Sequence, residues 1–597
     1  MTPAMKCTVC EKRCFVPESK TGGCGRYRNE NGTLREIYPD SYLLVCPISA
    51  ETMPIMNFYP GAKFLQISTT GCNFDCSGCV ATVVAKEVSS ESRALKKLTP
   101  PEIVQKALEE NCSGIAFLMN DPLASYYTFL EIAKTAKRHG LLAGCSSNGY
   151  FTEESASALS PFLDFINIGI KGLSDEDYRN CGAGPGYKPV LRNIGYFHEK
   201  GVHVEVACMH KKDEDHKVME IARTLSDISR DIPLQIMRFI PLDDSDIGTE
   251  PTIRESENIH RNARTVLNYV YLFNSPGSEC INTCCPQCGE LIYERDFYGP
   301  MGSKLRRASI SADEKHCPKC GCRLAVRGTL SNGSYNENDF EGGYPFTRAL
   351  EIIEGTLAAI GVKDQKSIAG CWEEMLQENG LQKLHGSIQN FESYAGAIHR
   401  FGSRTGKEKE AEKLTAYMRD RIRLILAKTE HLKDKPRVYY VMGTPLFSLE
   451  CERLENTLVE MAGGVSINRI LACTGRPGMK TSAEKLNALN PEVIFISSFM
   501  QTPLDEFYEY CDELGITADA VINRRVYNHP IPCIDFGSPR WILGLMHIAT
   551  CLHPDIFGFD IEAEAGAFYK EFYGLDFRLE DVNRSFAKPS MHWRITT

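Results

Sequence analysis

Cysteine is the residue type in this chain with the greatest capacity for chemistry. Of the 597 residues, 25 are cysteines, and 19 of these lie before residue 323. One group, Cys72, Cys76 and Cys79, is a C-x3-C-x2-C triplet. Three thiolates on one loop can bind three irons of a [4Fe–4S] cluster and leave the fourth iron open to another ligand. The triplet therefore predicts an iron–sulfur centre with an open coordination site.

Two further groups contain four cysteines each. The array consists of Cys7, Cys10, Cys14 and Cys24, and the quartet consists of Cys285, Cys288, Cys317 and Cys320. Four thiolates can hold zinc or an auxiliary iron–sulfur cluster that relays electrons, and the spacing of the array does not decide between them. The paired C-x2-C knuckles of the quartet are typical of a structural zinc ribbon. The isolated thiols are interpreted as small core residues: Cys46, Cys112, Cys145, Cys181 and Cys208.

The segments that must position the triplet alternate between two kinds of pattern. Short apolar runs predict strands at residues 64–68, 114–118, 142–146, 165–170, 202–208 and 234–239. Segments of helical period begin between them, near Pro101, Tyr126, Glu153, Lys188 and Asp215. Six strand–helix repeats predict an α/β fold in which a parallel sheet curls into a partial barrel. The triplet directly follows the first strand, at the edge where such folds carry their active sites.

The front half resembles the radical S-adenosylmethionine (SAM) superfamily. Within it, about residues 5–328 resemble the branch related to pyruvate formate-lyase activating enzymes, and in particular the AmmeMemoRadiSam group. Besides the cysteines, the motifs that carry the resemblance are Asn57-Phe-Tyr-Pro-Gly61, Gly71-Cys-Asn-Phe74, Leu98-Thr-Pro-Pro101, Asn120-Asp-Pro122, Asn148-Gly-Tyr150, Lys171-Gly172, Tyr269-Val-Tyr271 and Pro276-Gly277. The resemblance implies that SAM binds the open iron of a [4Fe–4S] cluster held by the triplet.

The resemblance also implies a SAM pocket at the ends of successive strands. The residues it places there are Asn120 and Asp121 at the amino group, Ser147 and Asn148 along the pocket, Lys171 near the carboxylate, and Gln235 and Arg238 facing the ribose or methionyl end. Three positions depart from the family pattern. Gly78 replaces an aromatic residue, Val80-Ala81 replaces a Gln-Asn pair, and Gly169 replaces an aspartate. These departures leave cluster binding intact and affect the shape of the pocket.

The back half begins after a change in composition. Residues 328–344 are rich in glycine, asparagine and serine, which indicates a linker. Apolar residues at helical spacing from Ala411 to Ile425 predict one long helix, which ends before Lys435-Pro436. Thr481-Ser-Ala-Glu484 reads as a capping box that opens a short helix. These features predict a separate α/β unit.

From about Lys407 onward, the chain resembles periplasmic binding proteins that capture siderophores, haem or cobalamin. The resemblance implies two α/β lobes joined by the long helix, and the few residues before that helix imply a reduced first lobe and a half-open cleft. Arg540, Trp541 and His529 are candidate cleft residues. The ligand expected from this resemblance is a metal chelate, such as a corrinoid, tetrapyrrole or siderophore.

We therefore expect five segments. They are a cysteine-rich metal module at 1–45, a radical SAM partial barrel at 46–275, a zinc-ribbon-like module at 276–327, the linker at 328–344 and a binding-protein-like domain at 345–597. The net charge of −10 argues against nucleic acid as a main partner. There is no apolar run long enough to span a membrane and no recognisable export signal, so we expect a cytoplasmic protein.

The function expected from these patterns is reductive cleavage of SAM to methionine and a 5′-deoxyadenosyl radical, which then acts on an unidentified substrate. The substrate could be a small molecule or a metal chelate held by the back half, and the electron would come from a ferredoxin or flavodoxin. Two alternatives remain open at this point. One is activation of a glycyl-radical enzyme, and the other is a non-catalytic carrier of iron–sulfur clusters or metallocofactors.

Overall fold

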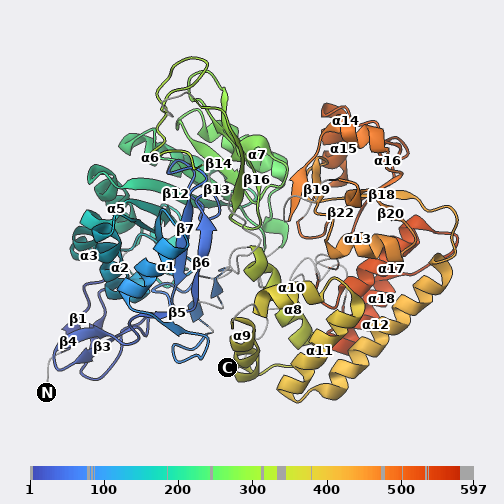
Figure 1. Ribbon diagram of the computed structural model, residues 1–597, viewed down its shortest axis with the longest axis horizontal. Helices are drawn as coiled ribbons and strands as arrows, with labels where there is room; N and C mark the ends of the chain where they lie inside the picture. Colours follow the sequence, from blue (N-terminus) through green and yellow to red (C-terminus); the bar gives the residue numbers. More distant parts are fainter. Residues whose placement is uncertain are drawn as a thin grey trace.

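The computed structural model in Figure 1 describes most of the chain. It covers residues 4–577 except 77–78, 80, 83–84, 87, 185, 242–246, 311–314, 332–343, 378–379, 472–476, 501, 531–533 and 535–536. The sequence departures at Gly78 and Val80 and most of the predicted linker therefore lie outside the described residues.

An eight-stranded sheet forms the centre of the front half (blue to green in Figure 1), in the order β14-β13-β12-β11-β10-β9-β7-β6. Its strands are β6 (Leu44–Ser49), β7 (Lys63–Ser68), β9 (Gly114–Phe117), β10 (Leu142–Ser147), β11 (Phe165–Gly169), β12 (His203–His210), β13 (Leu234–Arg238) and β14 (Val270–Phe273). All pairings are parallel except that of β6 with β7. The six predicted strands are confirmed, and the edge strands β6 and β14 are additions. Within the described residues these two edges do not pair with each other, so the sheet is open.

Helices cover one face of this sheet. They are α1 (Pro100–Glu109), α2 (Tyr126–Arg138), α3 (Glu153–Leu159), α5 (Lys188–Glu199), α6 (Asp215–Ile228) and α7 (Ile253–Ala263), and the short α4 (Asp175–Arg179) follows β11. Alternate strand residues such as Ile115 and Phe117 share one buried cluster with Ile132 of α2 and Ile194 of α5. This period-2 pattern directs one side chain in two toward the helices. The loops after the parallel strands consequently gather at one edge of the sheet.

A buried carboxylate organises the other face. Glu205 of β12 accepts hydrogen bonds from the backbone N–H groups of Met56 and Asn57 at 2.9 and 2.7 Å. It also accepts one from Gln235 Nε2 at 2.6 Å, and Asn167 Nδ2 donates to Gln235 Oε1 at 2.9 Å. A buried charge is tolerated where several donors satisfy it. This network fixes the loop before β7 against the strands.

Four small antiparallel sheets accompany the large one. They pair β1 (Met5–Lys6) with β2 (Phe15–Val16), β3 (Tyr27–Glu30) with β4 (Thr33–Glu36), β5 (Ser41–Tyr42) with β8 (Lys96–Lys97), and β15 (Thr283–Cys284) with β16 (Leu291–Phe297) and β17 (Ser303–Ala308). The cysteines of the array lie on the segments between the strands of the first two sheets, and the last sheet lies beside the quartet. Short sheets of this kind bury too little apolar surface to fold alone, so a metal or a neighbouring domain must stabilise them.

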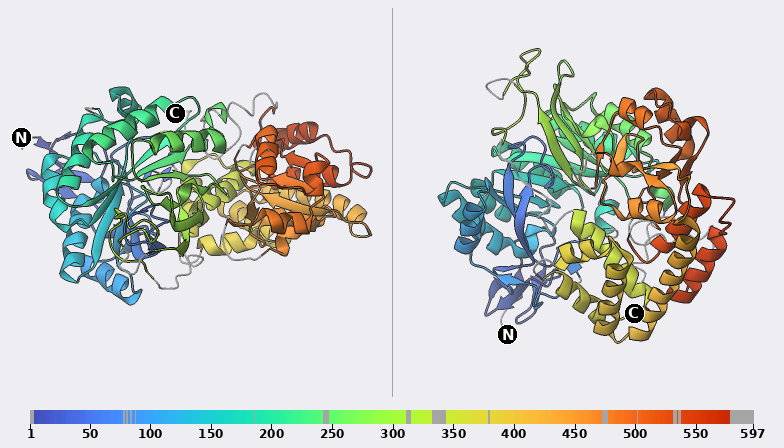
Figure 2. Two further views of the ribbon diagram at one scale, coloured as in Figure 1. Left: turned by 90° about the horizontal axis from the view of Figure 1, so that it is seen from above. Right: turned by 45° about the vertical axis from the view of Figure 1, so that its right-hand side comes forward.

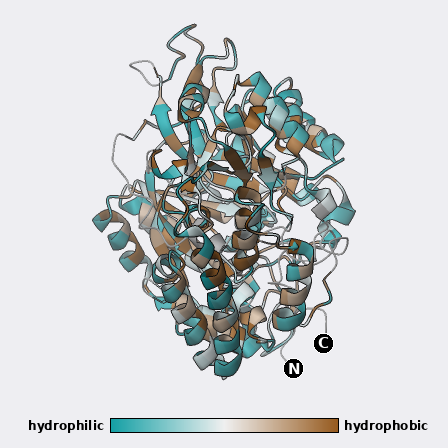
Figure 3. Cartoon of the chain, turned by 90° about the vertical axis from the view of Figure 1, so that its right-hand side faces the viewer, coloured by the Kyte–Doolittle hydropathy of each residue, from teal (hydrophilic) through white to brown (hydrophobic). Residues whose placement is uncertain are grey.

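The back half opens with a group of helices. They are α8 (Tyr344–Ala359), α9 (Gln365–Met375), α10 (Gly380–Ser387), α11 (Phe391–Thr405) and α12 (Glu408–Thr429). The predicted long helix is α12, and its apolar stripe, including Ala411, Met418 and Ile425, is buried. Figure 3 shows hydrophilic and hydrophobic residues alternating along the helices of this half. The described residues between 344 and 405 contain no strand, so the expected α/β first lobe is instead helical.

A mixed sheet follows, in the order β21-β19-β18-β22-β23, with β20 beside β18. Its strands are β18 (Arg437–Val441), β19 (Phe447–Leu449), β20 (Val465–Ser466), β21 (Gly478–Lys480), β22 (Val493–Ile496) and β23 (Val526–Asn528). The accompanying helices are α13 (Leu454–Met461), α14 (Ala483–Leu489), α15 (Leu504–Glu513), α16 (Asp519–Ile522), α17 (Trp541–Leu552) and α18 (Ile561–Phe568).

The predicted capping box at the start of α14 is displaced by one residue. The cap is Ser482, whose hydroxyl accepts a hydrogen bond from Lys485 N at 3.2 Å. A capping box needs glutamate or glutamine three residues after the cap, and this register puts a lysine there. Thr481 is therefore not the cap, although the predicted helix exists.

The two halves share a buried surface, and Figure 2 shows them side by side. Val88, Ala94 and Ile240 of the front half belong to the same hydrophobic cluster as Phe447 and Met500 of the back half. Ion pairs at the periphery include Arg254 with Glu513 at 2.9 Å. Val88 and Ala94 follow the triplet along the chain, and Ile240 follows β13. The back half therefore packs at the edge of the sheet that carries the triplet.

Candidate active site and metal centres

The triplet lies on the loop that leaves β7, and Asn120 holds the start of this loop. Asn120 Oδ1 accepts a hydrogen bond from Thr69 N at 3.0 Å, and Asn120 Nδ2 donates to Gly71 O at 3.0 Å. Gly71 has φ +89°, and a Cβ there would lie 3.0 Å from Arg26 Cδ, so only glycine suits this position. Asn120 is thus placed to shape the cysteine loop, with its amide already hydrogen-bonded.

A buried polar network continues along the neighbouring strand ends. Asp121, after β9, accepts hydrogen bonds from Asn148 N at 2.6 Å and from the Ser147 hydroxyl at 3.1 Å. Asn148 Nδ2 donates to Asn73 Oδ1 at 2.7 Å, which ties the network to the residue that follows Cys72. Burial raises the pKa of Asp121, while the hydrogen bond from Asn148 N opposes the shift. The structure therefore brings three of the predicted pocket residues together.

Lys171, after β11, directs its ammonium group toward the triplet. Burial lowers the pKa of Lys171, but the negative charges of Cys76, Cys181 and the other triplet thiolates outweigh burial, and the pKa is raised. A Cβ on Gly169 would lie 3.7 Å from Lys171 Nζ. Gly169, which stands where the family pattern has aspartate, therefore lies beside the lysine ammonium. Lys171 supplies a positive charge beside the cysteine loop.

Cys181 is a fourth thiol at this place, which the sequence interpretation missed. It follows α4, and its backbone oxygen accepts a hydrogen bond from Asp75 N at 2.8 Å. A hydrogen bond between the two thiols lowers the pKa of Cys76 to about 6 and raises that of Cys181. The interpretation of Cys181 as a simple core residue is therefore wrong. A contact across more than a hundred residues of chain leaves no local sequence signal.

The last two predicted pocket residues lie in other networks. Gln235 belongs to the buried cluster around Glu205. Arg238, fully buried, pairs with Glu250 at 2.8 Å, donates to Asn274 O at 2.9 Å and contacts Met500 Sδ at 3.3 Å. The structure thus places Arg238 where the front half meets the back half, and its guanidinium is already bound to protein groups.

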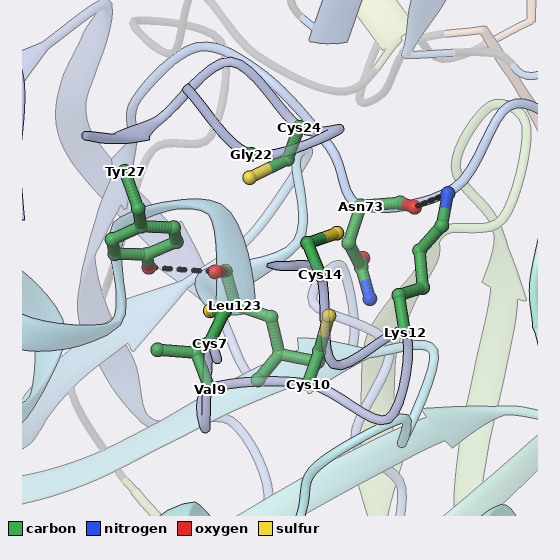
Figure 4. A pocket seen from close by; sticks show the side chains of 10 residues that line it. All are labelled: Cys7, Val9, Cys10, Lys12, Cys14, Gly22, Cys24, Tyr27, Asn73 and Leu123. Atoms are coloured by element: carbon green, nitrogen blue, oxygen red, sulfur yellow. Dashed lines mark hydrogen bonds between the residues drawn. The ribbon is translucent and has the colours of Figure 1, made fainter. Parts of the chain in front are cut away.

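The array lies close to the triplet. Its four sulfurs surround one cavity, shown in Figure 4, which Asn73 and Leu123 also line. Lys12 Nζ, from the array segment, donates to Asn73 O at 3.0 Å. Arg26, shortly after the last array cysteine, donates to Ala124 O at 3.1 Å and to Ser125 Oγ at 3.0 Å. These contacts dock the array segment on the strand-end loops, and sequence reasoning did not foresee the part played by Lys12, Arg26 or Asn73.

The quartet has a different geometry. The Sγ–Sγ distances are 3.6 Å for Cys285 with Cys320 and 3.6 Å for Cys288 with Cys317. All four sulfurs lie within 4.8 Å of one another, and this is the only group of three or more potential metal ligands that meets this condition among the described residues. A zinc–sulfur distance of about 2.3 Å places tetrahedral sulfurs roughly 3.8 Å apart. The quartet therefore has the size of a four-coordinate metal site.

The three candidate cleft residues of the back half are buried in its core. Trp541, 2% exposed, packs edge-on against Tyr394. Arg540 donates to Ser538 Oγ at 2.9 Å, and His529 hydrogen-bonds with the Tyr440 hydroxyl. Apolar burial explains the position of Trp541 at the start of the hydrophobic α17. The prediction that they line an open cleft is wrong.

Comparison with known families identifies the central part of the front half. The family model of the Radical SAM superfamily matches residues 67–225, from β7 through α6. The chain is also 29% identical over 331 residues to the "Uncharacterized protein MJ0808" of Methanocaldococcus jannaschii, which covers 54% of this chain and 95% of that protein. Residues 67–225 therefore form a radical SAM domain, and radical SAM chemistry requires SAM and an iron–sulfur cluster.

Solved structures with partial similarity include solute-binding proteins. A periplasmic solute binding protein of Veillonella parvula is 22% identical, with 33% of this chain and 61% of that chain covered and a TM-score of 0.30. An ABC transporter solute binding protein of Sulfurospirillum deleyianum is 25% identical, with 33% and 62% covered and a TM-score of 0.29. The chain spans less than two thirds of either protein. None of the helices in the described part of the chain is both long and apolar enough to cross a lipid bilayer.

Proposed function

We propose that the protein is a radical SAM enzyme whose active site lies on the cysteine loop after β7. The observation that carries the proposal is the convergence of the triplet, the Asp121–Asn148 network and Lys171 at one edge of the parallel sheet in a radical SAM domain. When bound, a [4Fe–4S] cluster on Cys72, Cys76 and Cys79 with SAM at its open iron supplies the reductive cleavage that yields a 5′-deoxyadenosyl radical.

The donor set fits such a cluster. The three thiols lie on one loop after a strand, and Phe74 N donates to Cys72 Sγ at 3.4 Å, as backbone groups do toward cluster sulfurs. The ammonium of Lys171 offsets the negative charge of the thiolates and would also attract the carboxylate of SAM. Asp121 holds Ser147 and Asn148 in place beside it. These residues therefore bind and orient, while an electron arrives from a ferredoxin- or flavodoxin-type donor.

The position of the back half bears on the substrate. It packs against Val88 and Ala94, which follow the triplet, and it contacts Arg238 at the end of β13. Because the back half covers this edge of the sheet, a small molecule would reach the active site more easily than an extended protein segment. This supports a small-molecule or metal-chelate substrate and argues against the glycyl-radical activase alternative. We propose that the back half contributes to substrate selection, and that the quartet holds a structural zinc ion.

The test compares wild type with Cys76→Ala after anaerobic reconstitution with iron and sulfide and reduction with dithionite in the presence of SAM. The matched control is Cys112→Ala, because Cys112 is a buried free thiol outside all three cysteine groups. We expect 5′-deoxyadenosine from wild type and the control, and at least about a hundredfold less from Cys76→Ala, because an incomplete thiolate set cannot hold the cluster. Equal product from Cys76→Ala would contradict the role of the triplet, and no product from a fully loaded wild type would instead favour the carrier alternative.

A further inference from the structure

The array and the quartet each contain four cysteine thiols, but the spaces between their sulfurs differ in size. The quartet sulfurs approach to 3.6 Å, whereas the array does not meet the 4.8 Å condition, although all four of its cysteines are described. Instead, the array sulfurs surround a small common cavity (Figure 4). A single zinc ion cannot bond to four sulfurs spread around such a space without drawing them together.

A four-iron cluster matches the wider spacing. Each thiolate binds a different iron at the corner of the cluster, so the cysteine sulfurs of a [4Fe–4S] site are separated by roughly 6 Å. The wall of the cavity is suited to an anionic cluster. Backbone N–H groups of Val9, Lys12 and Arg26 form hydrogen bonds to Cys7, Cys10 and Cys24 respectively. Such N–H to sulfur bonds stabilise reduced clusters and adjust their potentials.

The cavity is also adjacent to the proposed active site. Asn73 forms part of its wall and directly follows Cys72 in the chain. The Asn73 backbone oxygen accepts from Lys12 of the array segment, and the Asn73 amide oxygen accepts from Asn148 of the pocket network. One residue therefore contacts both sites, and a redox centre in the cavity would lie within electron-transfer range of the triplet.

We propose that Cys7, Cys10, Cys14 and Cys24 bind a second [4Fe–4S] cluster, which passes electrons to the cluster of the triplet. The array cluster would take one electron from a reduced ferredoxin- or flavodoxin-type protein and give that electron to the triplet cluster, returning to its oxidised state. Four thiolates leave it no open iron, so it binds no SAM. The relay role rests on the proposed function, whereas the metal assignment does not.

The first test uses the variant Cys72→Ala/Cys76→Ala/Cys79→Ala, which keeps the array intact. After anaerobic reconstitution, we expect about four irons and four sulfides per chain, with a reduced-cluster electron paramagnetic resonance signal that SAM does not change. Near-zero iron with a second zinc ion per chain would overturn the assignment. Because this variant cannot cleave SAM in any case, a failure of the proposed function leaves its iron count unaffected.

The second test measures proximity in dithionite-reduced wild type. Two reduced clusters that share Asn73 as a neighbour would couple magnetically, so the wild-type spectrum should be broader than the sum of two spectra. One of the two is the spectrum of Cys72→Ala/Cys76→Ala/Cys79→Ala, which keeps only the array. The other is the spectrum of Cys10→Ala/Cys14→Ala, which keeps only the triplet. If the wild-type spectrum equals this sum, the clusters are too far apart and the relay is wrong.

Discussion

The array and the quartet differ in how the chain brings their thiolates together. In the quartet, two C-x2-C knuckles face each other, and each is closed by a glycine with positive φ, Gly289 and Gly321, whose N–H bonds back to the first cysteine. In the array, the spacing is wider, and a short hairpin holds Cys7 opposite Cys14 through a 2.8 Å backbone hydrogen bond. Two knuckles give a space for one ion, while a hairpin and a long loop leave a cavity. The number of cysteines thus gives less information about the metal than the geometry of their loops.

Burial separates the two sites as well. Cys7 and Cys10 of the array are 6% and 8% exposed and belong to the core of the front half. In the quartet, Cys320 is exposed, and the cysteines pack in a small cluster of their own. A metal in the quartet therefore stabilises mainly its own small sheet, whereas the array depends on the domain around it.

The largest expected effect is loss of the metal from the quartet. Cys317→Ala should release about one zinc ion per chain and leave iron unchanged, because three sulfurs no longer close the site. The sheet of β15, β16 and β17 should then become sensitive to proteolysis, since structural zinc supplies about 10 kcal/mol or more to such small units. Metal analysis and limited proteolysis measure both effects.

The control for this change is Cys322→Ala. Cys322 packs beside the quartet, but its sulfur is not one of the four within 4.8 Å. Zinc content and protease resistance should match wild type. If Cys322→Ala loses as much zinc as Cys317→Ala, or if Cys317→Ala loses iron instead, the distinction between the two sites fails.

A smaller effect is expected at the array. The buried side chain of Arg26 anchors the array segment to the domain around it. Arg26 lies 4.0 Å from Glu36, and both side chains are almost fully buried. Arg26→Met would leave the carboxylate of Glu36 without its charge partner, so the free energy of unfolding should fall by about 3 kcal/mol. Urea unfolding of the reconstituted protein, followed by iron release, measures the change.

Arg35→Met provides the matched control on the neighbouring strand β4. Its ion pair with Glu30, at 3.9 Å, is exposed to solvent, so the change in stability should stay below about 1 kcal/mol. Equal losses from the two variants would show that the array segment is not anchored by Arg26.

The smallest effect concerns the back half, which should respond to acid through histidines. Burial lowers the pKa values of His529 and His547 to about 3. The unfolded chain therefore binds protons that the folded chain does not as the pH falls below about 6.5, so stability is lost on acidification. Between about pH 7 and 5.5, each histidine should cost roughly 1 kcal/mol.

Thermal unfolding at the two pH values measures this loss in wild type and in His547→Gln. The variant should lose less stability than wild type over the same interval. His431→Gln is the control, since His431 is 87% exposed and should leave the pH dependence unchanged. An unchanged slope in His547→Gln would mean that this histidine is not held neutral in the folded protein.

The sequence was most informative where a pattern is local. The alternation of apolar runs and helical periods located the six central strands, and α12 appeared where its apolar stripe predicted it. The edge strand β14 is as apolar as its neighbours, but it follows the last of the six predicted strand–helix repeats and was not predicted. The helical region before α12 was not predicted, because the resemblance to binding proteins implied a reduced α/β lobe there.

Contacts between distant segments could not be read in this way. Cys181 beside Cys76, Asn73 between the array and the pocket network, and Arg238 against Met500 all depend on how the chain folds back on itself. The family resemblance, together with their place on the sixth predicted strand, implied that Gln235 and Arg238 belong to the SAM pocket. In the structure, both side chains form hydrogen bonds with buried protein groups. A sequence alone does not distinguish such a structural role from ligand binding.

The most direct test of the account is a metal analysis of one anaerobically reconstituted wild-type sample, combined with X-ray absorption at the zinc and iron edges. The account predicts about one zinc ion per chain, with four sulfurs at about 2.3 Å, and about eight irons in two clusters. About two zinc ions in four-sulfur sites with only about four irons would contradict it, because the array would then hold zinc despite its wider geometry.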